Sequence, residues 1–430
     1  MKRLPMLVAT LGVVLATNAF AGWPYLNSVH HDTPGPGASP ETLSLVQPHV
    51  TAPTGDDPKP LPVFVQNGLA WLAEAQFDNG GWGAGSHANQ GVRDPHAVQI
   101  DPATTAFSAM AFLRAGNTLT DGAYHANVGK ALTYLLDLVE AYPEEGVKIS
   151  DVGGTQPQAK LGQHIDVAMV AQFFTQVLPH TEHDRALRGR VAGALEVCVT
   201  KLARAQDADG SWNSRGGWAG VLQSAMANSA LEMAGDLGVS LDEVVLEKSR
   251  EYQKGNLDAT SGAVRTESAA GIALYSIASN QRATAQEARE AKEKIEQGRR
   301  DGTLDLPASV SEEEAVSEEN LKKMGYDEDD ARRLNEAYRQ NKAAARMMQD
   351  EQVLSGFGNN GGEEFLSYMM TSESLAGVGG EDWEAWYKKM KGRLAKIQNP
   401  DGSWSGHHCI TSPVFCTAAV ILTMTADRVA

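Results

Sequence analysis

The chain has 430 residues, of which 42% are hydrophobic and 21% charged, and 54 acidic side chains against 37 basic ones give a net charge of −17. This composition excludes a disordered or collagen-like chain, and the length suits two or three domains or one large toroid or barrel. Because an acidic surface repels phosphates, no nucleic-acid partner is expected.

The first residues have the pattern of an export signal. Lys2 and Arg3 precede an apolar run from 4 to 16, and small residues in Ala19-Phe20-Ala21 form a cleavage site. We expect cleavage after Ala21 and a periplasmic or secreted mature protein. No later segment approaches ~18 consecutive apolar residues, so no stable transmembrane segment is expected.

Cysteine is too rare for a disulfide scaffold, since the chain contains only Cys198, Cys409 and Cys416. The odd number leaves at least one thiol unpaired within the chain. Cys409 and Cys416 are the best candidates for a pair, because Pro413 suggests that a helix begins between them.

Residues 22–61 are rich in Pro, Gly, Ser and Thr and have no sustained periodicity, which indicates an N-terminal arm. After residue 62 the apolar spacing is that of helices, and strand alternation bounded by hairpin turns is absent. The sequence therefore predicts an all-α fold for residues 62–430.

An internal repeat organises this helical region. The pattern LAxxQxxxGxW occurs at 72–82, 202–212 and 394–404. Each copy is expected to end a helix at the Gln, to turn at a Gly with positive φ, and to fold the Trp back over the helix end. The Gln amide can then satisfy terminal backbone groups.

The apolar spacing gives six helix pairs, with the copies of the repeat in the connections. The predicted pairs are 62–76 with 103–115, 122–142 with 163–178, 184–206 with 218–235, 241–254 with 263–279, a long charged stretch ending near 354 with 362–376, and 381–398 with 413–427. The second helix of each pair is rich in Ala, Ser and Thr, which suits close packing on both sides. We expect these second helices to form an inner ring and the first helices an outer ring, which is an (α/α)6 toroid.

Residues 283–352 are rich in Glu, Asp, Lys, Arg and Gln and are too long for one outer helix. They predict a charged helical insertion at the fifth outer position. Such an insertion also offers a surface for a protein partner.

The three Gln-to-Trp turns resemble the QW motif of the squalene and oxidosqualene cyclase and protein prenyltransferase superfamily. The resemblance covers residues 62–427. It implies a toroid with a central cavity, which members often use for an isoprenoid chain, so the ligand expected from the resemblance is an apolar small molecule or isoprenoid.

The catalytic motifs of that superfamily are altered here. Triterpene cyclases resemble one another in an acidic DxDDTA motif, and residues 101–106 read DPATTA, with Ala103 at the position of the proton donor and Thr104 at the last Asp. Because alanine has no proton to give, hopene-type cyclisation of squalene is not expected.

The Asp-x-Cys pair of the zinc-dependent protein prenyltransferases is also missing. His407, His408 and Cys409 are the only dense group of metal-ligand types, and adjacent residues rarely all reach one metal. We therefore expect no metal and no cofactor, and we interpret this segment as a cap on the last inner helix.

The candidate functional residues are polar side chains at or near the starts of inner helices, where the mouth of a cavity would lie. They are Asp101, His164, Asp166, Arg265, Glu267, Glu363, Glu364 and His408. Acids at helix starts also serve as caps, and a histidine there is often only hydrogen-bonded. Arg265 and Glu267 are expected to be partly buried on the fourth inner helix, either as an ion pair or as part of a site with His164 and Asp166.

Three functions remain open, and whether the chain is an enzyme is undecided at this stage. The first is an exported protein that binds or transforms an apolar ligand in the toroid cavity. The second is a non-catalytic binding or scaffold toroid. The third, ranked below both, is a polysaccharide-lyase-like enzyme, because Asn79-Gly80-Gly81-Trp82 followed by Ile100-Asp101 resembles one pectate lyase family.

Overall fold

The computed structural model describes residues 59–428 apart from residue 308. The expected signal peptide (1–21) and nearly all of the expected arm (22–61) lie outside the described residues. Regular structure in the described part is helical, and β-pairing is limited there to three isolated bridges. The predicted all-α fold is confirmed.

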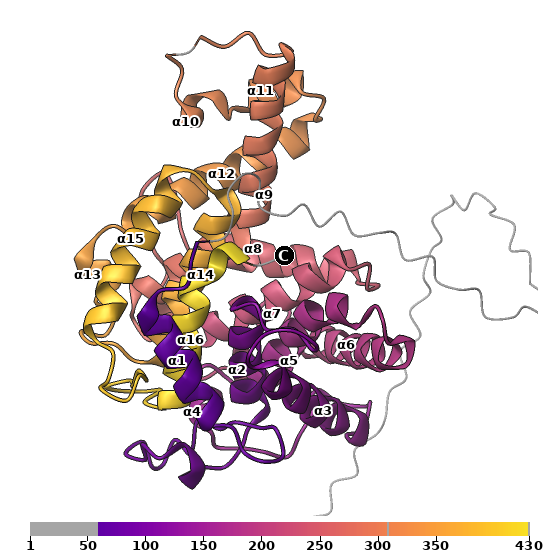
Figure 1. The fold of residues 1–430 in the computed structure, drawn as a ribbon. Coiled ribbons are helices and arrows are strands. Elements are labelled where there is room, and N and C mark those ends of the chain that lie inside the picture. Colours follow the sequence, from indigo (N-terminus) through magenta and orange to yellow (C-terminus); the bar gives the residue numbers. More distant parts are fainter. Residues whose placement is uncertain (1–58, 308, 429–430) are drawn as a thin grey trace, which may run out of the picture. The chain divides into compact units, whose positions relative to one another are not determined.

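Six helices form a closed inner ring, in which each packs against the next and the last packs against the first. They are α2 (Pro102–Arg114), α5 (Ile165–Val177), α7 (Gly220–Asp236), α9 (Ala273–Asp301), α14 (Gly362–Val378) and α16 (Pro413–Met424). Figure 1 shows how the ring closes, with the yellow α16 beside the indigo α1.

The outer helices alternate with the inner ones along the chain and pack on their outer side. They are α1 (Val63–Glu74), α3 (His125–Ala141), α6 (Arg185–Ala205), α8 (Glu243–Lys254), α12 (Glu328–Met347) and α15 (Glu381–Lys396). The predicted (α/α)6 toroid is therefore present, with six inner and six outer helices in the described residues.

The three repeat turns have the same hydrogen bonds. In each copy the Trp indole N–H donates to a Leu carbonyl ten residues earlier at 2.9 Å; the pairs are Trp82 with Leu72, Trp212 with Leu202, and Trp404 with Leu394. The Gln amide donates to the Gly carbonyl of its own turn and to the first turn of the next outer helix; the pairs are Gln76 with Gly80 and Asn127, Gln206 with Gly210 and Val245, and Gln398 with Gly402 and Phe64. The third copy thereby ties α15 to α1 and closes the outer ring.

The charged insertion has a small core of its own. Beyond the ring, α9 and α12 run side by side and are joined through α10 (Glu312–Ala315) and α11 (Glu318–Lys323), which lie at the far ends of the pair in Figure 1. Ile295, Leu321, Leu334 and Tyr338 are buried together between these helices. The insertion is thus a packed helical unit, and α12 fills the fifth outer position as predicted.

The fourth inner helix begins at Ala273, ten residues later than predicted. A bridge between Leu257 and Val264, a short 3-10 turn and a left-handed Ala270 (φ 53°) keep the preceding segment out of the helix. Arg265 and Glu267 therefore lie in this loop and are exposed. The expectation that they are partly buried on an inner helix was wrong.

Side chains fill the axis of the ring. Every residue of α2 and α16 is buried, and Phe107 stacks on Phe415 between these two helices with ring centroids 4.8 Å apart. A ligand chamber of about 300 Å³ or more would leave accessible area on its lining side chains. The inner helices of the described part leave almost none, so the ring is a packed core.

The expected disulfide between Cys409 and Cys416 is not formed, and all three cysteines are free thiols. Cys416 is buried in α16, and its thiol donates to the Ile410 carbonyl at 3.6 Å. The Cys409 thiol, on the preceding loop, interacts instead with Glu363.

Candidate functional site

The inner helices start at one end of the ring, and the polar residues predicted from the sequence gather there. We call this end the mouth. Helix starts carry a partial positive charge from unpaired backbone N–H groups, so six of them together favour acidic side chains. Two buried acidic clusters occupy the mouth, one at α2 and α5 and one at α14.

A short helix, α4 (Gln156–Lys160), lies across the mouth and closes it. The Gln156 side-chain carbonyl accepts two backbone N–H groups just before α16, at 2.7 and 3.1 Å. The Gln158 amide donates to Asp166 of α5 at 2.7 Å, and the Lys160 carbonyl accepts the N–H of Ala219 before α7 at 2.8 Å. One turn of helix thus links the starts of three inner helices.

The first acidic cluster is the pair Asp101 and Asp166. Asp101 caps α2 and accepts the backbone N–H groups of Ala84 and Thr104, both at 2.8 Å. Burial raises its pKa to about 6, although these two donors oppose the rise. Burial raises the pKa of Asp166 to about 8, and the nearby Asp101 charge adds to the rise. Asp166 is therefore largely a neutral carboxylic acid at pH 7, and its Oδ1 has no hydrogen-bond partner among the residues that the structure describes.

The second acidic cluster is Glu363 and Glu364 in the first turn of α14. Both are buried, and burial together with the Glu364 charge raises the pKa of Glu363 to about 7. Burial opposes ionisation of Glu364 as well, but donors from His408, Tyr275 and the backbone hold its pKa below the usual value. The two adjacent carboxyl groups thus differ in protonation at neutral pH: Glu363 is close to half-protonated, and Glu364 is ionised.

Three further side chains complete the second cluster. The Tyr275 hydroxyl at the start of α9 donates to Glu364 at 2.6 Å. His408 Nε2 lies 3.6 Å from Glu364, and this contact raises the pKa of His408. Cys409 has a left-handed backbone (φ 58°), a strained conformation for a residue with a Cβ, and its half-buried thiol faces Glu363.

His164 lies at the mouth but joins neither cluster through a side-chain hydrogen bond. It is buried just before α5, its backbone N–H donates to Gln223 at 2.7 Å, and its Nδ1 has no partner in the described residues. Burial lowers its pKa, so the imidazole is neutral at pH 7.

The structure therefore brings together Asp101 with Asp166, and Glu363 with Glu364 and His408. Arg265 and Glu267 lie instead in the exposed loop before α9, and of the two alternatives for them the structure shows neither a mutual ion pair nor a contact with His164 or Asp166 among the described residues. Sequence reasoning missed Tyr275 and Lys160. Tyr275 lies at the Ala-rich start of α9 and Lys160 in the five-residue α4, and neither segment has a sequence pattern that indicates a site. The closure of the ring brings both residues to the mouth.

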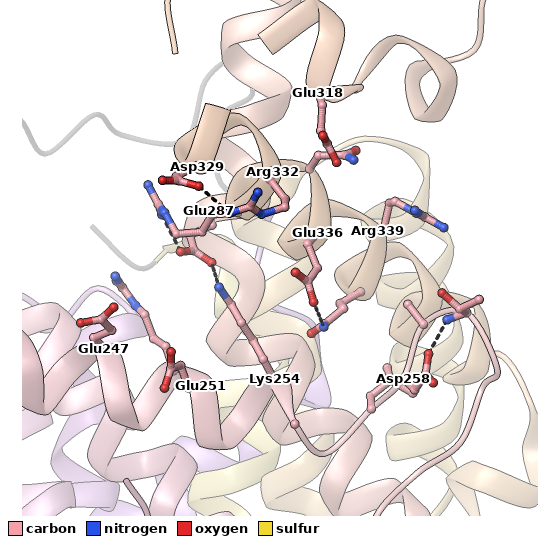
Figure 2. A pocket seen from close by; sticks show the side chains of 18 of the residues that line it. Glu247, Glu251, Lys254, Asp258, Glu287, Glu318, Asp329, Arg332, Glu336 and Arg339 are labelled. Atoms are coloured by element: carbon pink, nitrogen blue, oxygen red, sulfur yellow. Dashed lines mark hydrogen bonds and ion pairs between the residues drawn. The ribbon is translucent and has the colours of Figure 1, made fainter. Parts of the chain in front are cut away.

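Arg265 instead lines a charged groove of about 1390 Å³ between α8 and α12. Figure 2 shows Glu247, Glu251 and Lys254 on the α8 side and Arg332, Glu336 and Arg339 on the α12 side. Lys254 and Arg333 both pair with Glu287, at 2.5 and 2.6 Å, and so fix the insertion to the ring. Because these ion pairs join α8 and α12 to α9, we interpret the groove as a structural contact between the insertion and the ring, not as a binding site.

The opposite end of the ring is closed by buried ion pairs. Arg114 of α2 lies 2.5 Å from Glu373 of α14, and Arg282 of α9 lies 3.0 Å from Glu373 and 3.5 Å from Glu232 of α7. Because α16 lies between α2 and α14 in the ring, the Arg114–Glu373 pair joins two helices that are not neighbours.

Within the described residues, no group of three or more His, Cys, Asp or Glu side chains is placed to hold a metal ion. No helix of this part combines the length and apolar character needed to cross a bilayer.

Comparison with known proteins gives little to add to this geometry. No family profile matches the chain, and no curated protein matches it. Among solved structures, the chain is similar to a variant of the type II terpene cyclase MstE from Scytonema in complex with merosterolic acid A, at 13% identity and a TM-score of 0.31, over 85% of this chain and 96% of the cyclase chain. A likeness this low supports no conclusion on fold or function, and the toroid rests on the helix packing described above.

Proposed function

We propose that the chain is an exported toroid enzyme whose proton-transfer site is the second acidic cluster at the mouth. In this site Glu363 exchanges the proton, and the ionised Glu364 beside it is held by the Tyr275 hydroxyl and lies 3.6 Å from His408. The observation that carries the proposal is the difference in pKa between two adjacent buried carboxyl groups. The pKa of Glu363 is raised to about 7, whereas the pKa of Glu364 is lowered and this group is ionised.

Such a difference in pKa between neighbouring groups suits general acid–base catalysis. A general acid or base works best when its pKa lies near the working pH, and environments that push two neighbouring carboxyl groups apart assign them different roles. Here Glu364 accepts from Tyr275 and from the backbone N–H groups of Phe357 and Gly361, so its charge is fully used for positioning. Among the described residues Glu363 accepts the N–H of Ile410 at 3.2 Å and faces the Cys409 thiol, which leaves it capacity for a substrate.

The closed ring determines where a substrate would bind. Because the axis is packed, an isoprenoid enclosed in a central cavity would require displacement of the core. A substrate that docks on the outer surface of the mouth, beside His408 and Cys409, requires no such displacement. We therefore rank a surface-docked substrate above an apolar ligand in the ring.

The packed ring also favours a second candidate, a non-catalytic scaffold. In that case the buried acids serve as helix caps, as Asp101 and Glu364 do. Ring packing is compatible with both candidates, and the raised pKa of Glu363, about 7, supports the enzyme.

The test is turnover by the purified mature protein and by its Glu363→Gln variant. Isoprenoid diphosphates, squalene, and neutral and acidic oligosaccharides would be offered, with products identified by mass spectrometry. We expect turnover of one class with a limb in the pH–rate profile near 7, a loss of at least ~100-fold in Glu363→Gln, and an unchanged melting temperature. We expect no cyclised squalene, because Ala103 cannot donate a proton.

The exposed Glu267→Gln variant is the matched control, because Glu267 lies outside the cluster. If no class is turned over, or if Glu363→Gln turns it over as fast as the wild type, the proton-transfer site is refuted and the scaffold stands.

A further inference from the structure

The buried acids at the mouth are closed off from solvent in this structure. Asp101 and Glu364 have no exposed surface, and Glu363 and Asp166 are only 2% and 5% exposed. A site that exchanges a proton with a substrate therefore needs a part of the mouth that moves. The short helix α4 is the element whose attachment suits such a movement best.

α4 lies over both acidic clusters. In the first cluster the Gln158 amide donates to Asp166 at 2.7 Å. In the second, the backbone N–H groups of residues 410–412 are shared between a carboxylate and α4. Glu363 accepts the first of them at 3.2 Å, and the Gln156 side-chain carbonyl accepts the other two at 2.7 and 3.1 Å. Gln156 and Glu363 thus hold consecutive N–H groups of one loop.

α4 is attached mainly by hydrogen bonds. Three of its five side chains are polar, and the next residue of the apolar core along the chain is Leu161, directly after the helix. Its backbone is held by the bonds from the Gln156 N–H to Gly85 at 2.9 Å and from the Ala219 N–H to the Lys160 carbonyl at 2.8 Å. Water can replace hydrogen bonds at small net cost, so segments held in this way open locally more readily than segments with buried apolar contacts.

Glycines flank α4 at both ends. Gly154 has φ 70°, and a Cβ at this position would meet nothing within 4 Å, so the backbone has room to rotate. Gly162 has φ 138°, a conformation that residues with a side chain rarely adopt. Two such positions can take up large changes in the backbone dihedral angles and so act as hinges.

The loop before α16, which also covers Glu363, is anchored more firmly. Ile410 is completely buried in the apolar core, and its carbonyl accepts the N–H of Gly362 at 2.9 Å. Arg93 donates to the Thr411 carbonyl of the same loop at 3.1 Å. This loop therefore stays with the ring when α4 moves.

We propose that α4 is a lid that opens as one unit about Gly154 and Gly162, with the Gln156 side chain as its latch. The structure shows the closed form. Opening uncovers Asp166, frees two backbone N–H groups beside Glu363 and gives a substrate a path to this carboxyl group. The lid rests on the proposed function only for what it admits, because its opening is a property of the fold.

Amide hydrogen exchange of the mature protein, resolved to single residues, tests the lid without any substrate. The N–H groups of Thr411, Ser412 and Ala219 bond to opposite ends of α4 and serve as reporters. If the helix opens as a unit, the three should share one protection factor. Their exchange should depend only weakly on urea, because the opening exposes little surface. Amides in the middle of α5 should exchange through global unfolding, with a strong urea dependence.

Two variants disturb one end of α4 and are read at the other end. Gln156→Ala removes the latch, and exchange at Ala219 should rise by about 10-fold, the size expected for the loss of one or two hydrogen bonds. Gly217→Ala places a Cβ 2.4 Å from the Lys160 backbone. This wedge should raise exchange at residues 411 and 412 by about 10-fold as well.

Gly298→Ala is the matched control, because a Cβ there meets the Met324 sulfur at 2.4 Å within the insertion and not at the mouth. It should leave exchange at the three reporters within about 2-fold of the wild type, since distant sites act independently. Melting curves would verify that all three variants fold. Unchanged exchange at the remote end in both lid variants, or exchange of the reporters through global unfolding alone, would show that α4 is a fixed cap.

Turnover separates the lid from the proposed function. If Glu363 is active beneath a lid, Gln156→Ala should change KM or kcat for the class that is turned over, whereas Gly298→Ala should not. If α4 opens and no class is turned over, the lid stands and the proton-transfer site is refuted. If a class is turned over while the reporters exchange only through global unfolding, the lid is wrong and the proton-transfer site stands.

Discussion

The adjacent carboxyl groups of Glu363 and Glu364 show how the environment of each residue sets its chemistry. Both side chains are buried in the first turn of one helix, where the dipole favours negative charge equally. They differ in donors: Glu364 receives hydrogen bonds from Tyr275 and two backbone N–H groups, whereas Glu363 receives one from Ile410. Burial and the Glu364 charge therefore raise the pKa of Glu363, whereas the donors around Glu364 outweigh its burial and lower its pKa.

Asp166 allows a direct measurement of such a shift. Its pKa is about 8 in the folded chain against 3.8 for an ordinary Asp, so between about pH 4 and 8 the native state holds a proton that the unfolded state has released. Folding stability should therefore fall as the pH rises through this window, by up to ~1.4 kcal/mol per pH unit from this group. Asp166→Asn removes this contribution, and it should gain stability over the wild type from pH 5 to pH 8 in urea unfolding.

The control for this prediction is Asp258→Asn. Asp258 is exposed and its pKa is lowered by hydrogen bonds from Ser261 and Thr260, so it stays ionised throughout this window. Its variant should follow the wild-type profile between pH 5 and 8. Parallel profiles for Asp166→Asn and the wild type would show that Asp166 is not held neutral by the fold.

At the scale of elements, the repeat turn is the unit that joins one outer helix to the next. Each of its buried Trp side chains makes one indole hydrogen bond to the helix it covers. Replacing Trp by Phe leaves a buried carbonyl without its partner, which typically costs ~1 to 3 kcal/mol. We expect Trp82→Phe, Trp212→Phe and Trp404→Phe to lower the free energy of unfolding by similar amounts in this range.

Trp218→Phe is the matched control, because this exposed Trp donates no indole hydrogen bond within the described residues. It should change stability by less than ~0.5 kcal/mol. A loss confined to one of the three turns would show that the copies are not equivalent in energy, despite their equal geometry.

These turns also explain how far the sequence could predict the fold. LAxxQxxxGxW specifies its own hydrogen bonds locally, so the turns and the alternation of inner and outer helices follow from it. The start of the fourth inner helix does not, because 263–272 has the small residues of an inner helix and is kept out of it by a bridge to Leu257. That error placed Arg265 and Glu267 on the wrong surface.

The site was predictable only in part, for a related reason. Acids at helix starts could be recognised in the sequence, and Asp101, Asp166, Glu363 and Glu364 do lie at the mouth. Their partners come from distant segments: Tyr275 is 89 residues from Glu364, and the backbone group that Gln156 accepts at Thr411 is 255 residues away. Such pairings depend on ring closure, which no local pattern encodes.

At the scale of the whole molecule, the two ends of the ring are held by different means. The mouth is closed by α4 through neutral hydrogen bonds, whereas the opposite end is closed by buried ions. Burial opposes ionisation of Glu373, but Arg114 and Arg282 hold its pKa below the usual value. Since the Arg114–Glu373 pair joins helices that are not neighbours, its loss should lower the stability of the whole ring, which should still unfold in one cooperative transition.

Arg114→Met tests this coupling. It leaves Glu373 buried with one cation in place of two, and breaking a buried pair in this way typically costs ~3 to 5 kcal/mol. We expect a loss of this order in urea unfolding, within a single transition. The double variant Arg114→Met/Glu373→Leu should recover part of this loss, because no uncompensated charge remains.

The control is Arg190→Met, which breaks the exposed pair with Glu140 and should cost less than ~1 kcal/mol. If Arg114→Met and Arg190→Met cost the same, or if unfolding separates into two transitions, the ion pair does not couple α2 and α14 within the ring.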